Sequence, residues 1–240
     1  MINSFALSTS PSHLKMPAAA YVEQMSHLQR VYALKSSDID EMRSIYDEWA
    51  STYDSDLAES SQDYVGPGIA ASYVAKTLAE SSFKGPKIDD SSLVILDAGC
   101  GTGLVGIHLA KLGAKNVDGI DLSPGMLDVA RRTGSYRNLD TADLSKPLPN
   151  KNGEIDVITC VGTLTQGHVG PQAIDEFVRV VKHGGVIVAT VLDAIWAKEG
   201  YEAKVNELAA AGKIQILHVG LEEYRRGAGV QARMIVLQVQ

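Results

Sequence analysis

A glycine-rich segment between an apolar run and an amphipathic stretch limits this chain to few folds. Residues 93–96 read Leu-Val-Ile-Leu, which is typical of a short buried strand, and Asp97-Ala-Gly99-Cys-Gly101-Thr-Gly103 follows. Residues 104–112 have the pattern of a helix. Glycines let the backbone turn tightly and approach a ligand closely, and the free N–H groups of the following helix face the same place. The segment therefore predicts a strand–loop–helix unit that holds a ligand.

Strands and helices alternate after this unit. Further strands are predicted at 117–121, 136–140, 155–160, 186–192, 214–219 and 232–239. Helices are predicted at 124–132, 171–181 and 201–211, and a tight turn is predicted at 183–185. This alternation indicates a parallel sheet, and the short connection before the last strand permits an antiparallel ending. We predict an α/β fold with a doubly wound, seven-stranded, mostly parallel Rossmann-like sheet that binds its ligand at the carboxyl ends of the strands.

The segment before the first strand has helical patterns. They cover residues 18–34, the region around 42–53, and residues 69–79. A chain of 240 residues is long enough for one large α/β domain, and two full domains would be cramped. We predict an N-terminal helical cap or lid over residues 1–90, within the same domain as a core over residues 91–240.

Composition excludes several classes of partner. The formal net charge is −7, which disfavours binding to a nucleic-acid backbone. The basic pairs Arg131-Arg132 and Arg225-Arg226 are interpreted as a solvated helix end or turn. No apolar run approaches the roughly 20 residues of a membrane span. We therefore expect a small-molecule substrate, no nucleic acid and no membrane, and oligomeric state stays open.

Cysteine usage points to a reducing compartment. The chain has two cysteines, Cys100 and Cys160, and neither their number nor their spacing suggests a metal site or a disulfide framework. The first 22 residues have no apolar signal-peptide centre. We expect a cytoplasmic protein without a metal site.

The glycine loop by itself is compatible with two cofactors. Gly101-Thr-Gly103-Leu-Val-Gly106 matches the G-x-G-x-x-G fingerprint of dinucleotide-binding proteins. Asp121, at the end of the second strand, can accept hydrogen bonds from ribose hydroxyls in either a nicotinamide or an adenosyl enzyme. A dinucleotide is therefore an open alternative at this point.

Three features favour an adenosyl cofactor. Gly99, Gly101 and Gly103 have the tighter G-x-G-x-G spacing. Asp97 is placed to help hold the amino-acid end of S-adenosylmethionine, and it would face a pyrophosphate badly. Asp143, after the third strand, can accept a hydrogen bond from an adenine amino group. We predict that the loop binds S-adenosyl-L-methionine.

Four consecutive motifs resemble those of class I S-adenosylmethionine-dependent methyltransferases. They cover residues 93–106, 119–126, 141–144 and 156–163, in the order found in that superfamily. The resemblance implies the methyltransferase form of the Rossmann-like fold. It also implies that Asp121 binds the ribose, that Leu122 and Met126 pack on adenine, and that Ala142 and Asp143 hold its edge. The predicted cofactor-binding residues in this core are Asp97, Gly99, Cys100, Gly101, Asp121, Leu122, Met126, Ala142, Asp143, Leu144 and Cys160.

A narrower resemblance flanks these motifs. Tyr46-Asp-Glu-Trp-Ala-Ser-Thr-Tyr-Asp54, Tyr64-Val-Gly-Pro67 and residues 162–171 resemble the Williams–Beuren syndrome region methyltransferase-like group. Many of its members have no assigned substrate, so the resemblance implies the architecture more than the reaction. Gln166 stands where members often have His, and Gln cannot serve as a base.

Three aromatic residues recur on one helical face ahead of the glycine loop. Tyr46, Trp49 and Tyr53 fall at i, i+3 and i+7. They fit either a core-packing stripe or an aromatic lid over the sulfonium of the methyl donor, which aromatic faces stabilise while excluding water. In related methyltransferases a Tyr here reaches the donor's carboxylate. We therefore add these three residues to the cofactor site.

The candidate catalytic residues follow the fourth and fifth strands. His168 is the natural general base, if the acceptor needs one, and its alternative is a histidine that bonds the backbone of a Gly-rich loop. Asp193 is the second candidate, and its alternative is a helix cap.

The absence of known acceptor-specific sequence signatures narrows the range of possible methyl acceptors. The fourth strand lacks the Asn/Asp-Pro-Pro-aromatic signature of amide and exocyclic nitrogen methylation, and no Pro-Cys nucleophile or magnesium-binding carboxylate set stands out. We predict methyl transfer to an O, N, S or C atom of a small metabolite. Two alternatives are a non-methylating step, such as a cyclisation, and a non-catalytic cofactor-binding partner protein.

Overall fold

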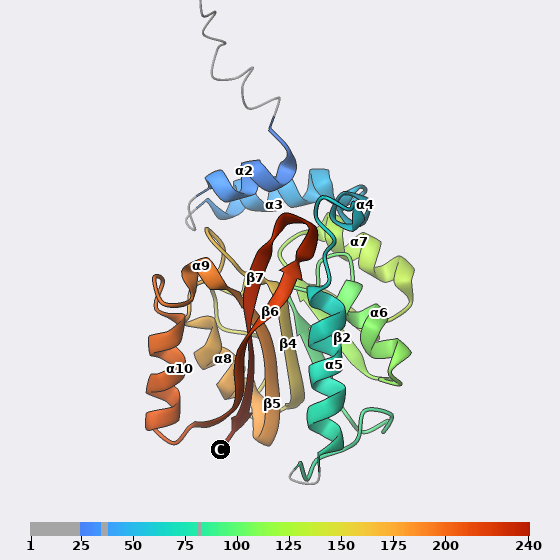
Figure 1. The fold of residues 1–240 in the computed structure, drawn as a ribbon. Helices are drawn as coiled ribbons and strands as arrows, with labels where there is room; N and C mark the ends of the chain where they lie inside the picture. The colour runs from blue at the N-terminus through green and yellow to red at the C-terminus, as the bar shows by residue number, and fades with distance from the viewer. Residues whose placement is uncertain (1–24, 35–37, 81–82) are drawn as a thin grey trace, which may run out of the picture.

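The protein is built on one seven-stranded sheet. The computed structural model describes residues 25–34, 38–80 and 83–240. Its strands are β1 (Ile95–Ala98), β2 (Val117–Asp121), β3 (Asn138–Thr141), β4 (Ile155–Leu164), β5 (Val181–Leu192), β6 (Ile214–Arg225) and β7 (Val230–Val239). Their order in the sheet is β3-β2-β1-β4-β5-β7-β6 (Figure 1). Strands β1 to β5 pair in parallel, and β7 is antiparallel to both β5 and β6. This arrangement confirms the predicted doubly wound sheet with an antiparallel ending.

Helices cover both faces and one end of the sheet. They are α2 (His27–Ala33), α3 (Ile39–Trp49), α4 (Tyr53–Ala58), α5 (Gly66–Ala79), α6 (Leu104–Lys111), α7 (Pro124–Thr133), α8 (Ala173–Val180), α9 (Asp193–Trp196), α10 (Tyr201–Ala210) and the 3-10 turn η1 (Arg226–Ala228). Helices α2, α3 and α4 lie across the end of the sheet where the parallel strands finish (Figure 1). The cap therefore sits over the edge where an α/β fold binds its ligand.

Helix α2 of the cap has a defined N-terminal capping motif. Ser26 accepts a hydrogen bond from the N–H of Gln29, and the Gln29 side chain accepts one from the N–H of Ser26, so a capping box starts α2. The predicted helix 18–34 is therefore confirmed only in its last part, because residues 18–24 lie outside the described residues.

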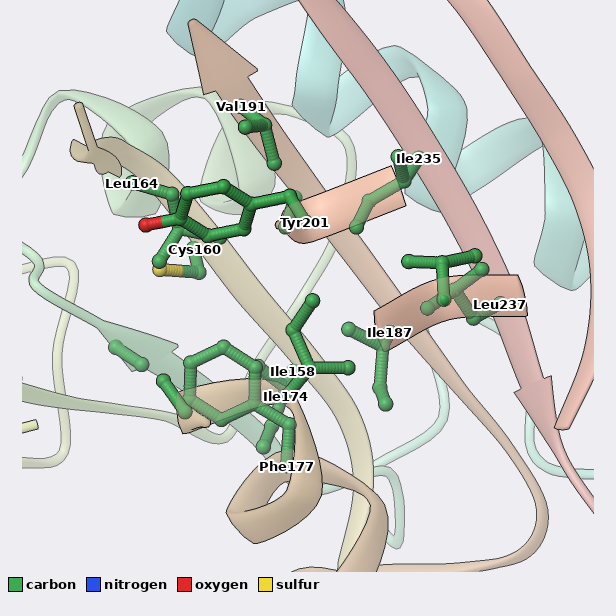
Figure 2. Packing of buried hydrophobic residues seen from close by; sticks show 14 of the residues in the cluster. Ile158, Cys160, Leu164, Ile174, Phe177, Ile187, Val191, Tyr201, Ile235 and Leu237 are labelled. Atoms are coloured by element: carbon green, nitrogen blue, oxygen red, sulfur yellow. The ribbon is translucent and has the colours of Figure 1, made fainter. Parts of the chain in front are cut away.

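The two faces of the sheet carry separate apolar cores. On one face Ile174 and Phe177 of α8 and Tyr201 of α10 pack against Ile158 and Ile235 of the sheet (Figure 2). The other face is covered by α5 and α6, whose contacts include Ala70, Ala71, Val74, Leu78, Val105 and Leu109. Helix α5 lies inside the predicted 1–90 segment yet packs along the sheet, while α2 to α4 cover its end.

The largest differences from the predicted strand bounds are in β4, β5 and β6, which sheet pairing extends by four to six residues. β4 continues to Leu164, which pairs with Val191, and β5 begins at Val181, which pairs with Ile155. The residues of the predicted turn at 183–185 belong to β5. They form an irregularity in this strand, where Gly184 has φ +81°. β6 continues to Arg225, because its pairing with β7 runs to the Arg225–Val230 pair. Hydrogen bonding to a neighbour thus lengthens strands beyond their local sequence signal.

Candidate functional site

The glycine loop after β1 has the backbone that its sequence requires. Gly99, Gly101 and Gly103 have φ of +75°, +54° and +97°, a region that side chains with Cβ rarely adopt. At Gly99 an added Cβ would collide with Thr163 Oγ1, whereas at Gly101 it would meet no atom within 4 Å. Gly99 is thus required by close packing under the loop, and Gly101 faces open space.

Asp121 connects this loop to the end of β2. Its Oδ2 accepts a hydrogen bond from the N–H of Gly101 at 2.9 Å, and its Oδ1 accepts one from the N–H of Ser123 at 2.9 Å. Burial raises the pKa of Asp121, and these backbone donors oppose the rise. The two hydrogen bonds hold the carboxyl group in one orientation at the carboxyl end of β2.

A cavity opens between the loop, the ends of β2 and β4, and the cap. It encloses about 690 Å³ of space not filled by protein atoms, including its open mouth. Eleven of the predicted site residues line it: Tyr46, Tyr53, Gly99, Gly101, Asp121, Leu122, Met126, Ala142, Asp143, Leu144 and His168. The structure thus brings most of the predicted cofactor site and one predicted catalytic residue to a single cavity, which we call the cofactor cavity.

Six further residues, which were not individually predicted as site residues, line the cofactor cavity. They are Ile39, Met42, Val161, Gly162, Thr163 and Val169. Ile39 and Met42 precede Tyr46 by seven and four residues, so helical spacing alone could have placed them on the same face. Val161 to Thr163 belong to the extension of β4, which no local pattern indicated.

Asp97 lies beneath the loop and does not line the cavity. It is fully buried, and its Oδ1 accepts from Thr159 Oγ1 at 2.8 Å while its Oδ2 accepts from the Tyr136 hydroxyl at 2.7 Å. Burial raises its pKa to about 6, although the two hydroxyl donors lower it. In this geometry Asp97 supports the loop from below, while its predicted contact with the ligand has no counterpart among the cavity walls.

Four more predicted residues also lie outside the cavity walls. Cys100 and Cys160 are buried, and burial raises the pKa of both thiols. Cys160 belongs to the apolar core of the sheet (Figure 2). Trp49 is buried behind the two tyrosines, with its Nε1 donating to Asp56 at 2.7 Å. Asp193 accepts from Arg233 Nε at 2.7 Å in the first turn of α9, which fits a structural ion pair.

Asp143 is half-buried at the cavity wall. Its Oδ1 accepts hydrogen bonds from the N–H and the hydroxyl of Ser145, and its Oδ2 lies 3.1 Å from Lys146 Nζ. Burial raises the pKa of this carboxyl, but the donors from Ser145 and Lys146 outweigh burial, and the net pKa is lowered. Asp143 is therefore an ionised acceptor at neutral pH.

The aromatic residues of the cap meet His168. The Tyr46 hydroxyl lies 2.8 Å from His168 Nε2, and the rings of Tyr46 and Trp49 stack with centroids 6.0 Å apart. Tyr53 packs edge-on against Trp49 at 4.7 Å. Burial lowers the pKa of His168, which is therefore neutral at pH 7. The stripe is both a packed cluster and a wall of the cavity.

The carboxylates of Asp47 and Asp54 join the cap to the core through hydrogen bonds. Asp47 Oδ1 accepts hydrogen bonds from Ser123 Oγ at 2.5 Å and from the N–H of Gly125 at 2.8 Å. Asp54 Oδ1 accepts from Thr102 Oγ1 at 2.5 Å. These contacts join α3 and α4 to the start of α7 and to the glycine loop, so the cap is closed over the cavity.

The interpretation of Arg225 as part of a solvated turn is wrong. Only 7% of its surface is exposed, because it ends the extended strand β6 beneath the cap, whereas the adjacent Arg226 is exposed. Within the part of the chain that the structure describes, His, Cys, Asp and Glu side chains form no cluster suited to a metal ion, and none of the helices has the length and apolar character that a membrane span needs.

The residues of the cavity fit an adenosyl cofactor. Leu122, Met126 and Leu144 offer apolar walls for a flat ring, while Asp121 and Asp143 offer carboxylate acceptors for hydroxyl and amino hydrogens. The left-handed glycines keep the loop backbone free of Cβ atoms where it faces this space.

Comparison with known proteins gives the same family. A family model described as a methyltransferase domain matches residues 95–185. Human methyltransferase-like protein 27 is 36% identical over 179 residues, which cover 73% of this chain and 69% of that protein. A ubiquinone biosynthesis O-methyltransferase from Dechloromonas aromatica (strain RCB) is 34% identical over 139 residues, covering 55% of this chain and 56% of that protein.

A solved structure shares the fold. The magnesium protoporphyrin IX methyltransferase of Synechocystis PCC 6803, crystallised with bound S-adenosylmethionine, aligns with a TM-score of 0.53 and 22% identity, over 72% of this chain and 79% of that one. The predicted family, fold and cofactor are thereby confirmed. The chain belongs to the class I S-adenosylmethionine-dependent methyltransferases, in the Williams–Beuren syndrome region methyltransferase-like group.

Proposed function

We propose that this protein transfers the methyl group of S-adenosylmethionine to a small-molecule acceptor. The observation that carries this proposal is the single cavity in which the loop and Asp121 are faced by Tyr46, Tyr53 and His168 under a closed cap. An enclosed site of this kind suits a metabolite better than a protein or nucleic-acid substrate. The similarity to a ubiquinone biosynthesis O-methyltransferase supports a small acceptor.

The cofactor-binding roles divide between polar and apolar walls. We assign the ribose hydroxyls to Asp121, because its carboxyl group lines the cavity and is fixed by two backbone donors. We assign adenine to Leu122 and Met126, with its amino edge at Asp143. Tyr46 and Tyr53 cover the donor end of the site.

Catalysis then depends mainly on alignment and on exclusion of water. The cofactor supplies a methyl group on a sulfonium, which is transferred in line to a nucleophile. The residues of the cap hold the acceptor in line and keep water out, and this positioning is the main source of rate enhancement in such a displacement. When the acceptor carries a proton, His168 is placed to take it, directly or through the Tyr46 hydroxyl.

Binding and turnover measurements test the proposal and separate its alternatives. Isothermal titration calorimetry should show binding of S-adenosylmethionine, and its failure would leave a non-catalytic role. A metabolite screen that detects released S-adenosylhomocysteine should find an acceptor whose product is heavier by one CH₂ unit. Conversion of an acceptor without consumption of the cofactor would instead support a cyclisation or a rearrangement.

The cellular setting follows from the same residues. We propose a cytoplasmic location, which is supported by two free, buried cysteines. We also propose that the N-terminal segment acts as a cap within the same domain, supported by the contacts of Asp47 and Asp54 with the core.

A further inference from the structure

A second cavity adjoins the cofactor cavity on the side of the cap. About 340 Å³ of its space is not filled by protein atoms, including its open mouth, and half of the residues that line it are aromatic: Tyr32, Tyr46, Trp49, Tyr53, Tyr64 and Tyr224. We call it the aromatic cavity. Tyr46, Tyr53, Gly162 and His168 line both cavities. A molecule in the aromatic cavity therefore touches the same wall that faces the cofactor.

Arg225 is the charged group of the aromatic cavity. It is the last residue of β6, and the tip of the β6–β7 hairpin lies below the cap (Figure 1). Its Nη1 donates to Gln62 Oε1 at 2.9 Å, its Nη2 donates to the Tyr32 hydroxyl at 2.8 Å, and its guanidinium carbon lies 5.6 Å from the centroid of the Tyr32 ring. Among the described residues, Arg225 Nε is the buried side-chain nitrogen that has no hydrogen-bond partner.

Within the described residues, the side chains that accept hydrogen bonds from Arg225 are the neutral Gln62 and Tyr32. None of the ion pairs formed within the described parts of the chain includes Arg225, whereas its neighbour Arg226 pairs with Asp63 at 2.7 Å. Burial raises the pKa of Tyr46, Tyr53 and Tyr64, so these hydroxyls stay protonated and supply no negative charge.

A buried guanidinium in this state favours an anion. Removing a charge from water is costly unless a counter-charge and hydrogen bonds replace the solvent, and the lone Nε–H leaves one of these bonds unmade. Guanidinium matches a carboxylate in shape, because two parallel N–H groups can donate to its two oxygens. The surrounding aromatic faces favour a flat, apolar body attached to that carboxylate.

We propose that Arg225 binds the carboxylate of the methyl acceptor, and that the acceptor is a small aromatic carboxylate seated in the aromatic cavity. This assignment rests on the proposed methyltransferase function. The carboxylate lies at Arg225, and the accepting atom lies toward Tyr46, Tyr53 and His168, which form the wall shared with the cofactor. Arg225 is then a specificity-determining residue supplied by the last hairpin of the chain.

Matched pairs of acid and amide test this assignment. The probes are 4-hydroxybenzoate against 4-hydroxybenzamide and phenylacetate against phenylacetamide, titrated by calorimetry into protein saturated with S-adenosylhomocysteine. We expect at least one acid to bind about tenfold or more tightly than its amide, because a charged hydrogen-bonded partner at a buried site contributes at least this much. Equal binding, or no binding, of every acid and amide would overturn the proposal.

Variants of the two adjacent arginines locate the effect. Arg225→Gln should remove the preference for the acid while S-adenosylmethionine binding is unchanged, and Arg226→Gln should keep the preference, since Arg226 is exposed and pairs with Asp63. An acid preference that survives in Arg225→Gln would refute the role of Arg225. If Arg225→Gln does not fold, the wild-type protein still tests the role of Arg225 by NMR. The ¹⁵N-edited signal of Arg225 Nε–H is assigned by its loss in Arg225→Lys. This signal should shift when the acid binds and should not shift when the amide is added.

Failure of the proposed function is distinguishable from failure of this inference. Acid binding that depends on Arg225, in a protein that neither binds S-adenosylmethionine nor releases S-adenosylhomocysteine, would support the anion site and reject the methyltransferase role. Turnover of neutral acceptors only, with no acid preference, would support the methyltransferase role and reject the anion site.

Discussion

The hydroxyl oxygen of Tyr46 lies 2.8 Å from Nε2 of His168, so the ring nitrogen nearest the cap is already hydrogen-bonded. On the other side of the ring, Nδ1 lies 3.0 Å from the carbonyl oxygen of Gln166, which can only accept a hydrogen bond, and 2.8 Å from Thr165 Oγ1, which can donate or accept one. The tautomer with its hydrogen on Nδ1 bonds the Gln166 carbonyl, and in that tautomer Nε2 accepts the hydrogen of the Tyr46 hydroxyl. A proton taken from an acceptor can pass to the Tyr46 oxygen while the Tyr46 hydrogen moves to Nε2.

Removing either partner of this pair should slow turnover to a similar degree. With an acceptor found by the release screen, we expect His168→Ala and Tyr46→Phe each to lower kcat by about 10²-fold, the usual contribution of a positioned base. The double variant should lose little more, because both residues serve one proton path. Calorimetry should show that S-adenosylmethionine affinity is kept in His168→Ala. Normal turnover in either variant would exclude the relay.

The pH dependence of turnover should reflect the lowered pKa of the buried His168 side chain. Burial lowers its pKa from the ordinary value of 6.5, so the neutral, proton-accepting form persists to more acidic pH. For an acceptor that must lose a proton, we expect the acid limb of the kcat profile to lie below pH 6.5 and to be absent in His168→Ala. An acid limb above pH 6.5 would contradict a buried neutral histidine as the base.

Asp121 should control the affinity for the cofactor. Asp121→Ala removes the carboxyl acceptor that we assign to the ribose hydroxyls, and it leaves the N–H of Gly101 without its partner. We expect S-adenosylmethionine affinity to fall by about 10- to 100-fold in calorimetry, as is typical for loss of a charged hydrogen-bond partner. Asp118→Ala is the matched control, since Asp118 lies on the same strand but pairs with Arg137 away from the cavity. Equal affinity of both variants would remove Asp121 from the ribose site.

Asp97 should make the protein relatively more stable in mild acid. Its pKa is raised by burial to about 6 in the folded state, against 3.8 for an unperturbed carboxyl. Between these values the folded state binds more protons than the unfolded state, so the contribution of Asp97 to stability grows as the pH falls. The free energy of unfolding of the wild type, relative to Asp97→Asn, should therefore rise by about 1.4 kcal/mol between pH 8 and pH 5. Urea unfolding at both pH values measures this, and parallel curves for the two proteins would contradict a raised pKa.

The first two glycines of the loop should respond differently to alanine. In Gly99→Ala both the positive φ and the contact with Thr163 are unfavourable, so we expect a loss of at least about 2 kcal/mol of stability. In Gly101→Ala only the backbone strain applies, at about 1 kcal/mol, but the methyl group enters the space of the cofactor cavity. Thermal unfolding and calorimetry together should show Gly99→Ala mainly destabilised and Gly101→Ala folded with weak cofactor binding. The reverse pattern would mean that the loop faces the other way.

Much of the fold could be predicted because its signals are local. Apolar runs that end in Asp or Gly, a serine–proline helix start and a glycine loop each report burial or backbone geometry within a few residues of chain. These patterns predicted the succession of strands along the chain and permitted the antiparallel ending, and Asp121 and Asp143 lie at or after the ends of their strands as expected. Strand ends such as Leu164 and Arg225 were missed because pairing with a distant neighbour extends them.

The sequence by itself determined the strand–loop–helix unit, the cofactor class and the stripe that includes Tyr46, since each depends on residues close together in the chain. Only the tertiary structure decided which groups face the cavities. Asp97 is held beneath the loop by hydroxyls 39 and 62 residues distant and does not line the cofactor cavity, and Arg225 is buried under a cap residue 193 positions before it. The local sequence around an arginine does not show whether its side chain lies on an exposed turn or in a cavity. Burial is created by segments that meet only when the chain has folded.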